Sequence, residues 1–165
     1  MDTFKNYLPL CWFKSNPLEL IRSYNFLKSN LIYSFIVEFF LQANMTDDPI
    51  ESFYEVSLET LITLLFVALL LYLNKTMFNF IQISSALFFC SNAAATVIIP
   101  VLIWLTITEN TISYYLVGMI IFWDFTMATY IFRRVLSLNI PASAIVALIY
   151  SIVTYFGAFT LGQLI

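Results

Sequence analysis

Histidine is absent from this 165-residue sequence, and charged residues make up only 10% of it. The lack of histidine removes the usual zinc ligand and the commonest general base. Hydrophobic residues make up 61% of the chain, more apolar surface than a domain of this size can bury. Seven Lys and Arg against ten Asp and Glu leave a net charge of −3 and no basic patch, which excludes a nucleic-acid partner. The composition therefore predicts a polytopic membrane protein.

Cysteines and catalytic motifs are also scarce. The two cysteines are Cys11, near the start, and Cys90, within an apolar segment, and their sequence context suggests neither a disulfide nor a metal site. The chain contains no Gly-x-Ser-x-Gly elbow, Walker loop or HExxH motif. An intramembrane aspartyl hydrolase would need a second aspartate opposite Asp124, although Glu38 could substitute in principle. We therefore expect a non-enzymatic protein without a metal or a cofactor.

Five apolar stretches are each long enough for a transmembrane helix, which needs about 20 residues. They run approximately over residues 26–44, 56–73, 81–106, 112–132 and 142–161. The third contains Pro100, which removes a backbone donor and is expected to kink the helix. The start MDTFKNYLPL lacks the pattern of a cleavable signal peptide, so the first span is expected to direct insertion. These patterns predict a single all-α membrane domain over residues 1–165, with residues 1–25 as a cytoplasmic or interfacial segment.

The cationic residues predict how the five spans are oriented. They lie before or at the start of the first span, between the second and third, and between the fourth and fifth: Lys5, Lys14, Arg22, Lys28, Lys75, Arg133 and Arg134. By the positive-inside rule, this distribution predicts a cytoplasmic N-terminus and a C-terminus outside. The lipid bilayer is then the expected partner. The usage rich in Phe, Ile, Asn and Tyr is compatible with an AT-rich bacterial genome, which would make the location the inner membrane.

Two short segments have the pattern of a helix start. Asn16-Pro17-Leu18-Glu19 and Asp48-Pro49-Ile50-Glu51 each place a capping residue, a proline at the first helical position and an acid at the third. The first predicts a short interfacial helix from Pro17, with an apolar side formed by Leu18, Ile21, Tyr24 and Leu27. The second predicts a helix from Pro49 that continues into the membrane. The acids of this outer loop, Asp47, Asp48, Glu51, Glu55 and Glu59, favour a solvated face over the alternative of a weak divalent-cation site.

Two acids fall deep inside the predicted spans. Asp124 is about 3 Å from the middle of the fourth span, and Glu38 is about 5 Å from the middle of the first. A charged side chain at such depth costs at least about 2.5 kcal/mol, so both are expected to face the bundle interior. We predict a buried polar cluster of Glu38, Asn92 and Asp124, lined by Ser91, Thr96, Ser151 and Thr154. It could fix helix register and rotation, or form a proton or cation pathway; a different helix rotation would separate its members.

Small residues recur every four positions in the fifth span. They form two ladders, Ser143, Ala147 and Ser151, then Thr154, Ala158 and Gly162. Small side chains let another backbone approach closely. We expect these ladders to pack within the monomer, with a homodimer face as the alternative.

The layout of five closely connected spans resembles the Yip family of small membrane proteins. The matching features are Asn16-Pro17 before the first helix and the small, polar run from Ser91 to Pro100 in the third span. The resemblance implies a five-span fold, and the eukaryotic members are implicated in Rab-linked membrane traffic. The long acidic cytoplasmic N-terminus of those members is missing here, so neither a Rab partner nor a functional residue is carried over.

The spans and the missing catalytic motifs together suggest the function. We predict a non-enzymatic integral membrane protein that organises or associates with other membrane components, which could include other membrane proteins. The alternative is a small proton-coupled or ion-conducting transporter that uses Glu38 and Asp124.

Overall fold

The computed structural model describes residues 2–43, 48–108 and 110–163, and every regular element in these ranges is helical. The all-α prediction is confirmed for this part of the chain. The elements are α1 (Asp2–Tyr7), η1 (Leu8–Trp12), η2 (Pro17–Glu19), α2 (Tyr24–Ala43), α3 (Pro49–Leu73), η3 (Met77–Asn79), α4 (Phe80–Thr108), α5 (Thr111–Leu136), α6 (Ile140–Ser151), the π-helical η4 (Ile152–Phe156) and α7 (Gly157–Gly162).

Four helical segments among the described residues are long and apolar enough to cross a membrane. They are Pro49–Leu73, Met77–Thr108, Thr111–Leu136 and Ile140–Gly162, which correspond to the predicted second to fifth spans. The predicted first span corresponds to α2, which has 20 residues but is not among these four, because polar residues such as Lys28 and Asn30 reduce its hydropathy. Its predicted end at Asn44 lies outside the described residues.

Both predicted helix starts carry the expected cap, but only one begins a long helix. The Asp48 side chain accepts a hydrogen bond from the Ile50 amide at 2.8 Å, and α3 begins at Pro49 as predicted. The Asn16 side chain likewise accepts from the Leu18 amide at 3.2 Å, yet the helix ends after a single turn at Glu19. The prediction of an interfacial helix from Pro17 is therefore wrong.

Side chains from other elements explain why that helix stops. Gln82 of α4 donates to the Leu20 carbonyl at 2.6 Å, and the Tyr7 hydroxyl donates to the Ile21 carbonyl at 3.0 Å. These bonds satisfy backbone acceptors that a continuing helix would have paired. The chain accordingly runs extended after Leu20 until α2 begins at Tyr24.

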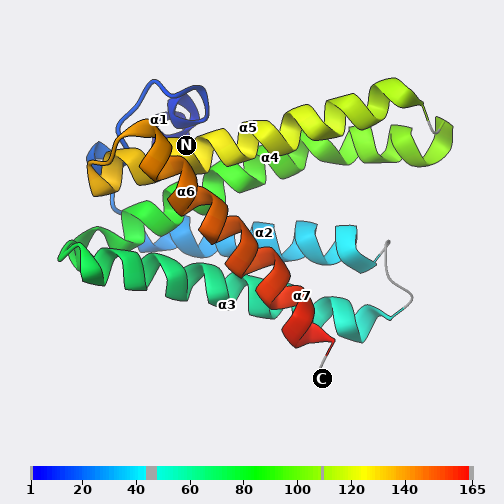
Figure 1. The fold of residues 1–165 in the computed structure, drawn as a ribbon, viewed down its shortest axis with the longest axis horizontal. Helices are drawn as coiled ribbons and strands as arrows, with labels where there is room; N and C mark the ends of the chain where they lie inside the picture. Colours follow the sequence, from blue (N-terminus) through cyan, green and yellow to red (C-terminus); the bar gives the residue numbers. More distant parts are fainter. Residues whose placement is uncertain (1, 44–47, 109, 164–165) are drawn as a thin grey trace.

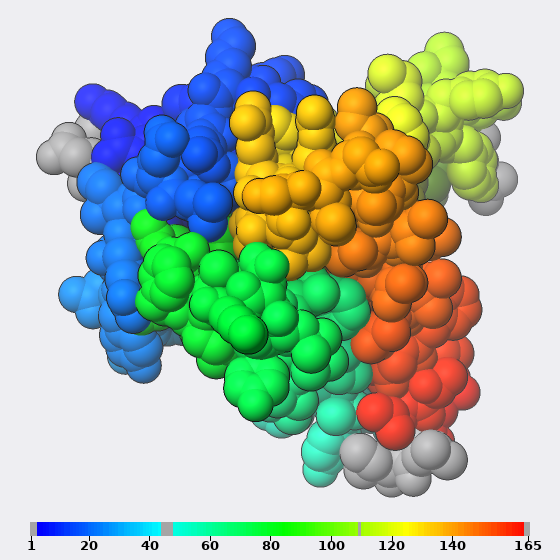
Figure 2. All heavy atoms as spheres, turned by 60° about the vertical axis from the view of Figure 1, so that its left-hand side comes forward, coloured from blue at the N-terminus to red at the C-terminus, as the bar shows by residue number. Residues whose placement is uncertain are grey.

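The N-terminal segment instead folds back along α4 and α5. Its aromatic rings pack against rings of these helices, with Phe4 against Phe89 at 5.2 Å and Trp12 against Trp123 at 5.7 Å between centroids. The Trp123 indole donates to the Cys11 carbonyl at 3.1 Å. In Figure 2 the segment, in dark blue, covers the side of the molecule next to α4 and α5.

The long helices run alongside one another, while α6, η4 and α7 cross α3 obliquely (Figure 1). The N-terminal segment, the α3–α4 turn and the α5–α6 turn lie at one end of the bundle, and the α2–α3 and α4–α5 connections lie at the other. All seven Lys and Arg residues lie in these segments or in the adjoining helix ends, with Lys28 near the start of α2 and Arg133 and Arg134 in the last turn of α5. We call this end of the bundle the basic end.

The core surrounds the first half of α4, where every residue from Ile83 to Cys90 is buried. Helix α3 shows the opposite pattern, with an exposed leucine at every fourth position from Leu61 to Leu73. The opposite face of α3 is therefore turned toward the bundle. It carries Glu55, Glu59 and Thr63.

Candidate functional site

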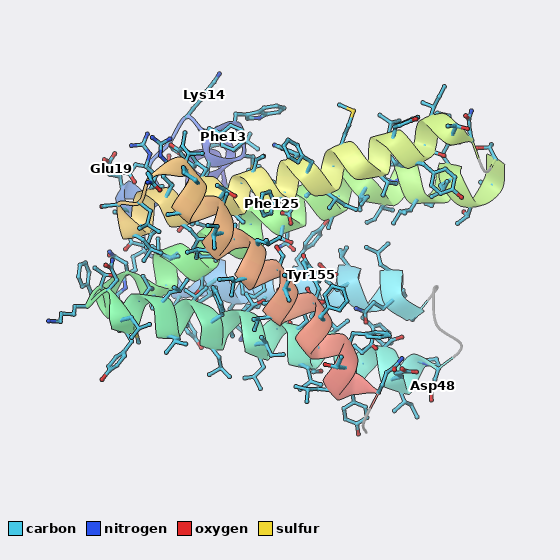
Figure 3. The ribbon with its side chains drawn as sticks, viewed as in Figure 1. Phe13, Lys14, Glu19, Asp48, Phe125 and Tyr155 are labelled. Carbon is cyan, nitrogen blue, oxygen red and sulfur yellow. The ribbon has the colours of Figure 1, made fainter. Side chains whose placement is uncertain are left out.

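A cavity of about 750 Å³ lies between α2, α4, α5 and the α6–η4 segment. Its walls are mostly aliphatic and aromatic, and its polar residues are Glu38, Gln42, Ser91, Asp124, Ser151 and Tyr155. None of the described residues that line it is Lys or Arg. Phe125 of α5 and Tyr155 of η4, labelled in Figure 3, come from its two sides.

The two cavity acids lie at the same depth in the bundle. Glu38 follows the first residue of α2 by 14 positions, and Asp124 precedes the last residue of α5 by 12. Both of these helix ends are at the basic end, so the two carboxyls lie roughly 18–21 Å from it at 1.5 Å per residue. They are close enough for their charges to interact. The sequence prediction that these two acids face the same interior space is consistent with this geometry.

A third acid, Glu59 of α3, is within electrostatic range of this pair. It precedes the last residue of α3 by 14 positions, so it reaches the same depth of about 21 Å from the basic end. Its charge interacts with those of both Glu38 and Asp124. Although Glu59 does not line the cavity, it completes a set of three carboxyls from three helices, which we call the acid cluster.

The predicted solvated face of the outer loop therefore requires correction. Glu55 is only 5% exposed and Glu59 is half-buried, because α3 begins at Pro49 and its spacing of four turns both side chains toward the bundle. Asp47 lies outside the described residues. Glu59 could have been recognised from the sequence, since Glu55, Glu59 and Thr63 lie opposite the leucine stripe that begins at Leu61.

The predicted polar cluster divides into two groups. Ser91 and Ser151 line the cavity with Glu38 and Asp124, whereas Asn92 and Thr96 do not. Successive residues of a helix are rotated by about 100°, and this turns Ser91 toward the cavity and Asn92 toward α2. Asn92 is therefore not among the residues that line the cavity with the acids.

Asn92 belongs to a separate network between α4 and α2. Its amide donates to the backbone and side-chain oxygens of Asn30 at 3.1 and 3.2 Å. The Thr96 hydroxyl donates to the Asn92 carbonyl at 2.7 Å and lies 2.9 Å from the Tyr33 hydroxyl. These contacts hold α2 against α4 and have no direct part in the cavity.

The fifth apolar segment contains a π-helical turn beside the cavity. Such turns inside α-helices occur frequently at functional sites. Thr154 in this turn is buried and donates to the Tyr150 carbonyl at 2.7 Å, so it stabilises the turn and does not line the cavity. The next residue, Tyr155, does line it. No pattern in the sequence predicted either the turn or the position of Tyr155.

The small residues of this segment pack inside the molecule. Ser143 and Ala147 are fully buried in α6, which packs on α5, and Ala158 and Gly162 are buried in α7, which packs on α3. A methyl group added at Gly162 would lie 2.5 Å from Cγ of Glu55. The remaining predicted packing residue, Ser151, is half-buried and lines the cavity.

The two cysteines are far apart in the sequence, but their sulfur atoms lie 3.9 Å apart as free, buried thiols. The N-terminal segment folds back onto α4 and brings Cys11 to Cys90. A hydrogen bond with the Cys90 thiol lowers the pKa of Cys11. Among the described residues, no three Cys, Asp or Glu side chains are placed to hold a metal ion.

A scan against protein-family models and searches of curated proteins and of solved structures found no match to this chain. The resemblance to the Yip family stays a prediction.

Proposed function

We propose that the chain is an integral membrane protein with five spans, of which α2 is the first. Its 20 residues correspond to about 30 Å of helix, the thickness of the hydrocarbon core. Helix α2 packs on α3 and α4 and runs along the bundle with them (Figure 1). Its polar Asn30 and Ser34 are buried in the bundle, so they do not require water at that depth.

The positive-inside rule then places the basic end in the cytoplasm and the C-terminus outside. The exposed Phe4, Leu8 and Trp12 of the N-terminal segment, next to Lys5 and Lys14, fit a position at the inner membrane interface. In a bacterium this membrane is the inner membrane.

Within this arrangement we propose that the protein is a non-enzymatic, proton-coupled transporter. The observation that supports it is the cavity into which Glu38 and Asp124 both face, without a lining Lys or Arg among the described residues. A carboxylate inside the membrane is stable only with a counter-charge or a proton. A polar group that serves only to fix helix register would not need an acid-lined cavity of this volume. The site therefore favours transport over a purely organising role.

Proton uptake into reconstituted vesicles tests this proposal. Vesicles of phosphatidylcholine and phosphatidylglycerol contain a pH-sensitive dye, and a potassium gradient with valinomycin imposes the driving potential. Asp124→Asn and Glu38→Gln keep the side-chain volume and remove the exchangeable proton. We expect each to slow proton uptake about tenfold or more, since proton transfer needs a titrating group.

Glu19→Gln is the matched control, because Glu19 is exposed at the basic end (Figure 3) and its bond from the Asn16 side chain is one that glutamine can also accept. This variant is expected to keep the wild-type rate. Unchanged uptake in the Glu38→Gln, Asp124→Asn double variant would contradict proton transport through the acid cluster.

A further inference from the structure

We propose that the cavity binds a monovalent amphipathic organic cation, a molecule with an apolar or aromatic body and one ammonium or phosphonium centre. This inference rests on the proposed transport function, for which it names the class of solute. It uses three properties of the cavity: its volume, the chemistry of its walls and the position of its charges.

The volume and the walls fit an organic molecule better than a bare ion. Small-molecule sites have volumes of roughly 300–1,000 Å³, are mostly apolar and contain few polar groups. This cavity, at about 750 Å³, lies within that range. Leu102, Ile121 and Phe122 in its walls cannot replace the water shell of a hydrated metal ion, but they can bury an apolar body.

The charges of the cavity select for a cation. Glu38 from α2 and Asp124 from α5 both line the cavity, and no described lining residue could neutralise an anion. The aromatic rings of Phe125 and Tyr155 also line the cavity, and aromatic faces attract organic cations. An anion of equal size would meet the same walls and be repelled by the acids.

The cavity extends from the acids in one direction along the helices. Along α4 its lining extends from Ser91 to Leu102, about 16 Å of helix toward the end opposite the basic end. Along α5 it includes Gly118, where an added methyl group would have no neighbour within 4 Å. Most of the lining therefore extends from the acids away from the basic end.

A cation that binds in the cavity replaces a proton on one of the carboxyls. When a cavity carboxyl is protonated, it releases its proton to water as the cation arrives, and the resulting carboxylate pairs with the cation. The titratable groups that face this step are Glu38 from α2, Glu59 from α3, Cys90 from α4, Asp124 from α5, and Tyr150 and Tyr155 from the C-terminal segment.

Tetraphenylphosphonium and tetraphenylborate test the proposal, because they have the same shape and opposite charge. Equilibrium dialysis with detergent-purified protein measures the binding of each, and a dye in weakly buffered solution measures proton release. We expect saturable binding of the phosphonium, with proton release, and binding of the borate that is weaker by about tenfold or more, because the acids attract one ion and repel the other.

Three variants complete the design. Asp124→Asn and Glu38→Gln are expected to weaken phosphonium binding about tenfold and to abolish proton release in combination. Gly118→Phe adds a ring at a lining residue whose Cβ would have open space around it, and it is expected to weaken binding without removing an acid. Glu19→Gln should bind like the wild type. Folding of each variant is checked by thermal unfolding.

Equal binding of the two ions, or phosphonium binding unaffected by the acid variants, would overturn the proposal and would indicate an apolar occupant such as a lipid acyl chain. If proton uptake in vesicles still depended on the acids, only the class of solute would be wrong. If charge-selective binding occurred but proton uptake did not depend on the acids, the transport function would fail while the cation site remained.

Discussion

At the scale of single residues, the closest packing that a substitution can probe is the contact between Gly162 and Glu55. A Cβ atom at Gly162 would lie 2.5 Å from Cγ of Glu55, whereas a Cβ at Gly118 would have no neighbour within 4 Å. Gly162→Ala is expected to destabilise the protein by about 1–3 kcal/mol, the usual cost of overpacking. Gly118→Ala is expected to be neutral or stabilising by about 0.5–1 kcal/mol, through helix propensity. Thermal unfolding in detergent compares them, and equal shifts would contradict the close approach of α7 to α3.

A substitution of Asn92 distinguishes a structural role of this residue from a role in the cavity. Among the described contacts, its amide donates only to Asn30. The residue of the same helix that lines the cavity with the acids is Ser91. Asn92→Ala is expected to lower stability by about 1–2 kcal/mol, because Asn30 loses its buried donor. Phosphonium binding should remain at the wild-type level. A loss of binding comparable with that of Asp124→Asn would show that Asn92 belongs to the site after all.

At the scale of elements, the N-terminal segment offers a direct check of its docking on α4. Diamide oxidises two adjacent thiols to a disulfide and is itself reduced to a hydrazine. The Cys11 and Cys90 sulfur atoms are 3.9 Å apart, and the lowered pKa of Cys11 increases the fraction of reactive thiolate near neutral pH. We expect one intramolecular disulfide, identified by peptide mass spectrometry and absent from Cys11→Ser and Cys90→Ser. Crosslinks only between two molecules would contradict the docked segment.

The elements also show which features a sequence can predict. Long apolar runs and the Asp48-Pro49 cap are local patterns, so they located the four apolar helices and the start of α3. The fold-back of the N-terminal segment depends on contacts between residues far apart in sequence, such as Cys11 with Cys90. For the same reason the helical turn that begins at Pro17 does not continue, because Gln82 and Tyr7 donate hydrogen bonds to the carbonyl groups that follow it. Such tertiary contacts override local helix preference.

The sequence predicts those residues of the candidate site that are recognised by their depth in the membrane. Glu38 and Asp124 are identified by their position within apolar spans, which requires no knowledge of packing. Assigning Ser91 instead of Asn92 to the cavity requires the rotation of α4, and one residue changes the facing direction by about 100°. Tyr155 depends in addition on the π-helical turn, which shifts the register of the residues after it.

At the scale of the whole molecule, the topology accounts for the acid cluster. Helices α2, α3 and α5 each have one end at the basic end and each place an acid 12 to 14 residues from it. Because these helices run along the same direction of the bundle (Figure 1), similar spacing becomes similar depth. Three separate sequence positions thereby form one cluster, and its function depends on the bundle being inserted as proposed.

Cysteine labelling tests that insertion, because Lys14 lies in the half of the bundle nearer the basic end and Asp48 lies at the opposite end (Figure 3). In a Cys11→Ser, Cys90→Ser background, single cysteines replace the exposed Lys14, Ile50 or Lys75. Intact cells are treated with a membrane-impermeant maleimide, and permeabilised cells serve as the control. If α2 and α3 both cross the membrane, Ile50→Cys is labelled in intact cells, whereas Lys14→Cys and Lys75→Cys are labelled only after permeabilisation. Equal labelling of Lys14→Cys and Ile50→Cys would show that α2 does not span. The reversed pattern would invert the proposed orientation and place the basic end outside.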